Sequence, residues 1–208
     1  RTAAVNVELT LITGQGSVTR ADAGSESFAE AGRTVVLQSS DVVETSSDSA
    51  ALLSLGDGAR LELGENTSLG ILEAGRTGVV QQFILSASLD RGRIVARLES
   101  SPLRGGSLRL ETRVVTVETK QAVLECQIID KQQAAVFVHE GTATVSMGDQ
   151  VIDLEAGQGV RAALGQPLVA VQLVGGAPIP LVALTPMGEH SQPPAVLSEG
   201  PTLTRDSL

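Results

Sequence analysis

The chain has 208 residues, a formal net charge of −9 and an apolar fraction of 42%, yet it contains three Phe and no Tyr or Trp. Sites for sugars and for single-stranded nucleic acid usually rely on flat aromatic side chains, and nucleic-acid surfaces also need clustered Lys and Arg. The composition therefore argues against both ligands, and the negative charge argues against binding to an anionic membrane. The length suits one large β domain or two small ones.

In chain order, the first predicted element is a strand at 5–11, whose apolar residues alternate with polar ones. The stretch 25–31 allows a short helical turn, but we expect very little helix in the chain. The same alternation predicts further strands at 59–63, 107–112, 136–138 and 142–146.

The sharpest turn signal is Asp57-Gly58, because a two-residue hairpin turn needs a positive φ that Gly adopts without steric cost. The flanking leucines, at 53 and 55 on one side and at 61 and 63 on the other, are predicted to lie on the paired strands. Other turn signals separate the remaining strands, at Gly64-Glu65-Asn66, Asp90-Arg91-Gly92, Gly105-Gly106, Glu140-Gly141, Gly148-Asp149 and Ala156-Gly157. Strands separated by turns every eight to twelve residues are typical of an all-β sandwich, barrel or solenoid.

The C-terminal part differs in composition. The apolar stretch 167–184 contains three prolines and Gly175-Gly176, so it is not a membrane-spanning helix. Four more prolines follow, at 186, 193, 194 and 201, without clean alternation. We expect one β domain at 1–174 and an extended Pro-rich tail at 175–208, ordered by lying on a neighbouring copy of the chain. No signal peptide is visible, and the start at Arg1 suggests a processed mature chain or a trimmed one.

No residue is predicted to be catalytic, to bind a cofactor or to ligate a metal. His139 and His190 lack the companion residues of zinc or catalytic motifs, and Cys126 lies in the apolar run 122–129, which favours a buried core thiol. His139 is interpreted as a polar residue at a strand end, and His190 as a solvated residue of the tail.

Several short motifs are interpreted as turns. Gly56-Asp57-Gly58 and Gly64-Glu65-Asn66 offer too few oxygens for calcium. Gly14-Gln15-Gly16 lacks the helix and Lys of a phosphate loop, and Asn66-Thr67-Ser68 is only formally a glycosylation acceptor. A hydrolase with Asp41 and Asp57 as paired carboxylates is the weakest functional hypothesis.

The serial order of several motifs resembles the FecR-like domain of bacterial extracytoplasmic proteins. The resemblance runs from about residue 9 to 162, and its motifs are 11–18, 40–45, 49–63, 66–71, 89–94, 136–145 and 154–158. The family usually carries an Arg-Gly-Thr-x-Phe segment before its final hairpin, whereas this chain has Ala122-Val123-Leu124-Glu125-Cys126-Gln127-Ile128 there. The expected fold is one antiparallel-rich FecR-like sandwich or short β-solenoid followed by the tail.

Two functional hypotheses follow. The leading one is a non-enzymatic structural subunit at the cell surface or outside the cell, which assembles with copies of itself through its terminal strands or tail. The alternative, implied by the resemblance, is a periplasmic or cell-surface sensory domain of a FecR-type signalling system that acts by contact with another protein. Both hypotheses exclude nucleic acid, membrane insertion and cofactors.

Overall fold

The computed structural model describes residues 3–4, 7–21, 23–55, 58–77, 82–98, 106–174 and 177–180, and these residues form strands and turns with no helix. The strands are β1 (Ala3–Ala4), β2 (Val7–Thr13), β3 (Gly16–Arg20), β4 (Gly24–Phe28), β5 (Thr34–Leu37), β6 (Val42–Thr45), β7 (Ala50–Leu55), β8 (Ala59–Leu63) and β9 (Ser68–Thr77). They continue with β10 (Gln82–Arg91), β11 (Arg93–Leu98), β12 (Gly106–Thr112), β13 (Thr116–Asp130), β14 (Gln133–Met147), β15 (Gln150–Glu155), β16 (Gln158–Ala163), β17 (Val169–Val174) and β18 (Ala177–Pro180).

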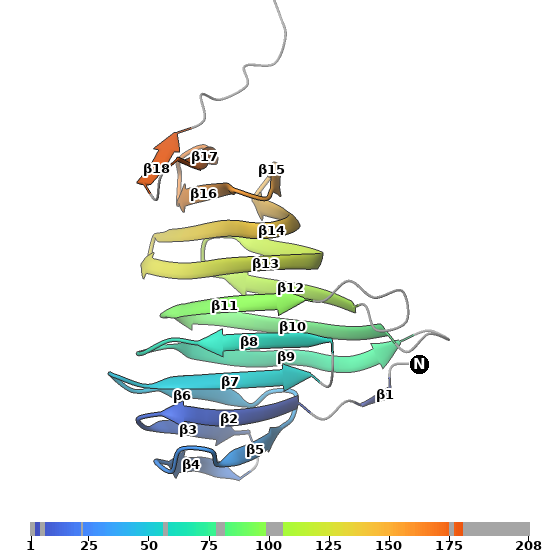
Figure 1. Cartoon of the computed structure of the whole chain (residues 1–208), viewed down its shortest axis with the longest axis vertical. Coiled ribbons are helices and arrows are strands. Elements are labelled where there is room, and N and C mark those ends of the chain that lie inside the picture. The colour runs from blue at the N-terminus through green and yellow to red at the C-terminus, as the bar shows by residue number, and fades with distance from the viewer. Residues whose placement is uncertain are drawn as a thin grey trace, which may run out of the picture.

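The strands stack across the long axis of the molecule and curl into a flattened barrel with two walls (Figure 1). The front wall has the pairing order β5-β2-β7-β8-β11-β13-β14-β16-β17-β18. The back wall has the order β4-β3-β6-β9-β10-β12-β13-β14-β15, with β1 paired to the far end of β9. Among the described strands, every pairing is antiparallel except that of β10 with β12.

Strands β13 and β14 belong to both walls. The first half of β13 pairs with β12 and the second half with β11, while β14 pairs with β16 through its first half and with β15 through its second. The predicted turn at Glu140-Gly141 is therefore wrong: it is a bend within β14, where Gly141 has a φ of +78°. This bend carries β14 from the front wall to the back wall.

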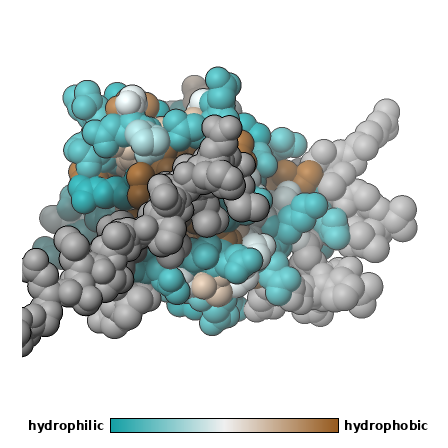
Figure 2. Space-filling view, turned by 90° about the horizontal axis from the view of Figure 1, so that it is seen from above, coloured by the Kyte–Doolittle hydropathy of each residue, from teal (hydrophilic) through white to brown (hydrophobic). Residues whose placement is uncertain are grey.

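The core lies between the walls and is built from the inward residues of the alternating pattern. Strand β8 shows the principle, since Ala59, Leu61 and Leu63 are buried while Arg60 and Glu62 are exposed. Successive side chains of a strand point to opposite faces of the sheet. The period of two in the sequence therefore reflects one buried face and one exposed face in each wall. Seen along the stack, hydrophilic residues form most of the visible rim and hydrophobic ones appear mainly between its two sides (Figure 2).

At two corners where the chain passes from one wall to the other, a glycine of positive φ lies against a Ser or Thr side chain. Gly14 (φ +77°) lies against Ser49, and Gly92 (φ +86°) lies against Thr67. In both corners the residue after the glycine donates its N–H to the neighbouring hydroxyl, from Gln15 to Ser49 at 2.9 Å and from Arg93 to Thr67 at 3.1 Å. A side chain at either glycine would overlap its neighbour, because a Cβ at Gly92 would lie 2.5 Å from the Cα of Thr67.

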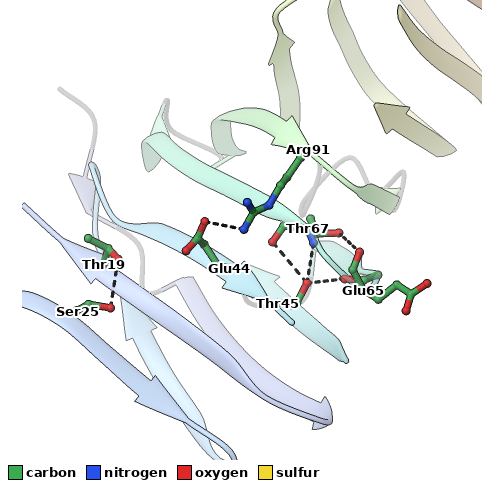
Figure 3. A network of polar contacts seen from close by, with 8 residues as sticks. Thr19, Ser25, Glu44, Thr45, Glu65, Thr67 and Arg91 are labelled. Atoms are coloured by element: carbon green, nitrogen blue, oxygen red, sulfur yellow. Dashed lines mark hydrogen bonds and ion pairs between the residues drawn. The ribbon is translucent and has the colours of Figure 1, made fainter. Parts of the chain in front are cut away.

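The buried hydroxyl of Thr45 also joins consecutive levels of the stack (Figure 3). Thr45 Oγ1 donates to the carbonyl of Gly64 at 2.6 Å and accepts the N–H of Thr67 at 2.9 Å. Thr45 and Thr67 are buried. Backbone groups that the turn leaves without a strand partner are thus satisfied by side chains, as buried polar groups must be.

Each of the three phenylalanines covers a cross-strand glycine. The pairs are Phe28 with Gly16, Phe83 with Gly106 and Phe137 with Gly159. A Cβ on each glycine would come within 3 Å of the ring that covers it. The few aromatic side chains of this chain fill the gaps that strand glycines leave, a known device for stabilising glycines in sheets.

The all-β, mainly antiparallel fold predicted from the sequence is confirmed, and it combines a sandwich cross-section with the stacked levels of a solenoid. The helical turn at 25–31 is wrong, because 24–28 form β4, which pairs with β3 and buries Phe28 over Gly16. The leucine-flanked hairpin is confirmed by the pairing of Leu53 with Leu61, while Asp57 lies outside the described residues. Of the predicted tail, only Ala177–Pro180 is described, as β18 on β17.

Candidate interaction surface

A groove of about 1010 Å³ lies on the outer face of the back wall. Six neighbouring strands, from β9 to β15, contribute to it. Their outward residues form two rows across the strands. One row is Glu73, Ser86, Arg109, Glu118, Thr144 and Asp153, and the other contains Ile84, Ser107, Thr142 and Glu155.

Charge in the groove is unbalanced. Four carboxylates line it, against the two cations Arg109 and Lys120. Arg109 is already held at 2.8 Å by Glu111 and at 2.7 Å by Glu118. The hydrogen bond to Glu111, assisted by the charges of both carboxylates, raises the pKa of Arg109 above its ordinary value. The groove as a whole is therefore a polar surface with excess negative charge.

The end of the groove at β15 is the most acidic part. Asp153 Oδ1 accepts the hydroxyl of Thr144 at 2.7 Å, and Glu155 lies two residues further on the same face of β15. Both side chains are exposed. Extended strands hold alternate side chains on one face, so the two carboxylates project together at the rim of the wall.

The front wall offers a smaller and more balanced hollow. A groove of about 420 Å³ is lined by Ile12, Leu52 and Val95, with Glu62 and Arg93 at its rim. These two charged residues have partners in neighbouring strands, with Arg97 at 3.2 Å from Glu62 and Glu125 at 2.6 Å from Arg93. Both charged residues of this hollow are thus paired, and the back-wall groove is the stronger candidate for recognising a charged partner.

His139 lies on the outer face of the front wall within β14, not at a strand end. Its Nε2 is 3.6 Å from Glu125, and its ring meets the edge of Phe137 with 4.8 Å between the centroids. His190 lies outside the described residues. In the part of the chain that the structure describes, no three His, Cys, Asp or Glu side chains gather where they could share a metal ion.

The acidic motifs singled out in the sequence form turns wherever they are described. Asp41 is buried and accepts the N–H of Gln38 at 2.9 Å, which closes the turn before β6. Glu65 accepts the N–H of Asp48 at 3.1 Å across two neighbouring turns. The proposed carboxylate partner of Asp41, Asp57, lies outside the described residues.

Cys126 is fully buried in β13, as the apolar run suggests. Burial, with a smaller contribution from the charge of Glu125, raises the pKa of the Cys126 thiol from about 9 to about 12. Between these values the unfolded chain has lost this proton and the folded chain keeps it. The thiol therefore supports the folded state below pH 9, and its contribution falls by about 1.4 kcal/mol per pH unit as the pH rises further.

We expect this loss to appear in urea unfolding followed by far-UV circular dichroism at pH 7, 9 and 10. Because other groups titrate at high pH as well, the quantity to measure is the difference between the wild type and Cys126→Ala. The stability difference should be constant below pH 9 and shrink above it. Parallel stability curves up to pH 10 would show that Cys126 does not retain its proton in the folded chain.

Sequence reasoning missed the groove. Its residues come from six strands between 73 and 155, and the charged ones are ordinary outward residues of alternating segments. Only the pairing register, including the parallel pairing of β10 with β12, brings them together.

No helix in the described residues is long and apolar enough to cross a membrane.

Comparison with known proteins supplies a family and a fold. The model of the family described as FecR protein matches residues 41–144, from the residue before β6 into the second half of β14. Two crystal structures of a "putative anti-sigma factor" from Parabacteroides distasonis ATCC 8503 match with TM-scores of 0.51 and 0.50, each at 14% identity. Each match covers 63% of this chain and 59% of the other, and at this identity it shows a shared fold alone. No curated protein sequence matches the chain.

Proposed function

The chain belongs to the FecR protein family, whose model matches 104 of its 208 residues, and from this premise we propose that it is a regulatory domain of a signalling system outside the cytoplasm. It acts by binding another protein and catalyses no reaction. The family match carries the proposal. The likeness to structures described as those of an anti-sigma factor favours the same function.

The structure supplies a physical basis for such a role. Two walls tied by β13 and β14 and by buried hydroxyls at the corners make a stiff frame, on which outward side chains keep fixed positions. The back-wall groove displays an ordered pattern of charge on that frame. A surface of this kind suits recognition of a charged protein partner.

The sensory alternative is thus better supported than the self-assembling subunit. Neither the family match nor the similar structures support a filament. We propose the periplasm or another extracytoplasmic site as its location, on the strength of the family alone. Light scattering of the purified chain over a wide concentration range separates the two hypotheses: a constant monomer mass agrees with the signalling role, and growth into polymers overturns it.

The function itself is tested in the host, with the gene replaced by one of two glycine variants. Gly92→Ala disrupts a crowded corner, whereas Gly148→Ala changes a turn glycine with open space around it. Transcript levels are then compared across the genome. A discrete set of genes should change with Gly92→Ala and stay unchanged with Gly148→Ala. Unaltered transcription in a strain that has lost the folded domain would refute a signalling role.

A further inference from the structure

In the described part of the chain, the two walls end in four edge strands, which are not equally protected. Strand β18 carries Pro178 and Pro180, which have no N–H to offer a neighbouring strand. Strand β5 is covered at its centre, where Arg20 donates to the carbonyl of Val36 at 3.3 Å. Strand β4 exposes only small or polar residues over 24–27.

Strand β15 is different. It pairs with β14 on one side, and no described strand pairs with its other side. Val151 is 62% exposed on this strand, the largest exposure among the exposed large apolar residues of the described chain. Soluble proteins usually blunt such edges with Pro, Lys or a bulge, and an unprotected edge with an exposed apolar residue is a site for strand addition.

The hydrogen bonds of β15 indicate which of its backbone groups are open. Glu155 donates its N–H to the side chain of Gln158 at 2.9 Å and not to β14. In an antiparallel ladder, alternate residues direct both backbone groups to the same side. Asp153 and Val151 therefore share the outward direction of Glu155, and their N–H and C=O groups face the open edge.

The side chains along this edge determine what can pair with it. The outward residues of β15 are Val151, Asp153 and Glu155, and the inward ones are Ile152 and Leu154. Directly opposed side chains on paired strands favour opposite charges and disfavour like charges. A second copy of β15 would bring acidic residues of the two copies together on a chain of net charge −9, so this edge does not suit self-pairing.

We propose that the open edge of β15 accepts a β-strand from a partner protein, with Lys or Arg opposite Asp153 and Glu155 and an apolar residue opposite Val151. The added strand continues the back wall and closes the acidic end of the groove. This inference deepens the proposed function, on which it rests, by naming the surface and the chemistry of the partner.

The probe is a capped peptide with the core Lys-Val-Lys-Val-Val, which in antiparallel register sets its lysines against Glu155 and Asp153. The full chain is titrated with it and followed by amide NMR and hydrogen exchange. Binding should shift the resonances of β15 and protect the amides of Val151 and Asp153. A peptide of scrambled order, Lys-Lys-Val-Val-Val, should bind at least about tenfold more weakly, because its second lysine falls opposite Leu154 and leaves Asp153 without a partner.

Three variants locate the contact. Val151→Pro removes an outward N–H without breaking the ladder to β14 and should abolish protection, and the reversal Asp153→Lys with Glu155→Lys should weaken binding about tenfold or more. Glu8→Lys, on the exposed face of β2 in the front wall, is the matched control and should leave binding unchanged. Amide spectra of each variant without peptide confirm that it is folded.

Several results would overturn the proposal: no protection of Val151 and Asp153 with millimolar peptide, equal binding of the scrambled peptide, or a loss of binding in Glu8→Lys that Val151→Pro does not share. A dimer of the full chain that Val151→Pro dissociates would assign the edge to a second copy. The transcription experiment tests the whole folded domain and the peptide titration tests one edge, so failure of one is distinguishable from failure of the other.

Discussion

Replacing Gly92 by alanine is expected to destabilise the folded chain by about 3–5 kcal/mol, enough to unfold a marginal domain. Two effects add. The φ of +86° disfavours any residue with a Cβ, and the new atom would lie 2.5 Å from the Cα of Thr67, which is backbone and cannot rotate away. Urea unfolding is the measurement, followed by far-UV circular dichroism because the chain has no Trp or Tyr.

The matched control for this prediction is Gly148→Ala. Gly148 also has a positive φ, of +57°, but a Cβ there would meet no atom within 4 Å. Gly148→Ala should lower the free energy of unfolding by only about 1 kcal/mol, the penalty for a residue with a Cβ in the left-handed backbone conformation. Equal losses in the two variants would mean that the corner at Gly92 opens to accommodate a methyl group.

Thr45→Val is the second large effect, with an expected loss of about 2–4 kcal/mol in the free energy of unfolding. Valine has nearly the same shape, but it leaves the carbonyl of Gly64 and the N–H of Thr67 without their hydrogen-bond partner in a buried corner. Unpaired buried backbone groups carry the full penalty of their lost hydration.

Thr10→Val provides the comparison for Thr45→Val. The hydroxyl of Thr10 meets only that of Thr34, at 3.0 Å on the exposed face of the front wall. Water replaces such a contact, so the free energy of unfolding should change by less than about 0.5 kcal/mol. A loss at Thr45 as small as the loss at Thr10 would show that water reaches the corner.

The strands were predictable because alternation is a local property. The segment 59–63 coincides with β8, and the turns at Gly148-Asp149 and Ala156-Gly157 connect β14, β15 and β16. The bend at Gly141 was not predictable, since it depends on contact with the backbone carbonyl of Gln121 in the neighbouring strand. Locally, a glycine that ends a strand and one that bends it have the same sequence signature.

The corners explain part of the family resemblance in physical terms. Thr45, Thr67 and Gly92 all lie in motifs that resemble the FecR-like pattern, and each maintains a crossing between the walls. Their partners are distant in sequence, as the separation of 26 positions between Thr67 and Arg93 illustrates. The sequence pattern therefore identified these residues, but it could not show whether they form a binding site or stabilise a crossing between the walls.

The candidate surface was the least predictable feature. Asp153 and Glu155 appear in the sequence as ordinary polar residues of an alternating strand. Their position at an open edge follows from the register of β14 and β15 and from the split of β14 between the walls. Long-range pairing of this kind has no local signature.

The passage of β14 through both walls also determines how the domain carries mechanical load. A pull on β15 acts first on the second half of β14, and the first half of the same strand is bonded to β13 and β16 in the front wall. Force applied at that edge is therefore shared by both walls through one continuous backbone. A partner that exerts force on β15 would therefore move the end of the stack as one unit and would not separate the two walls.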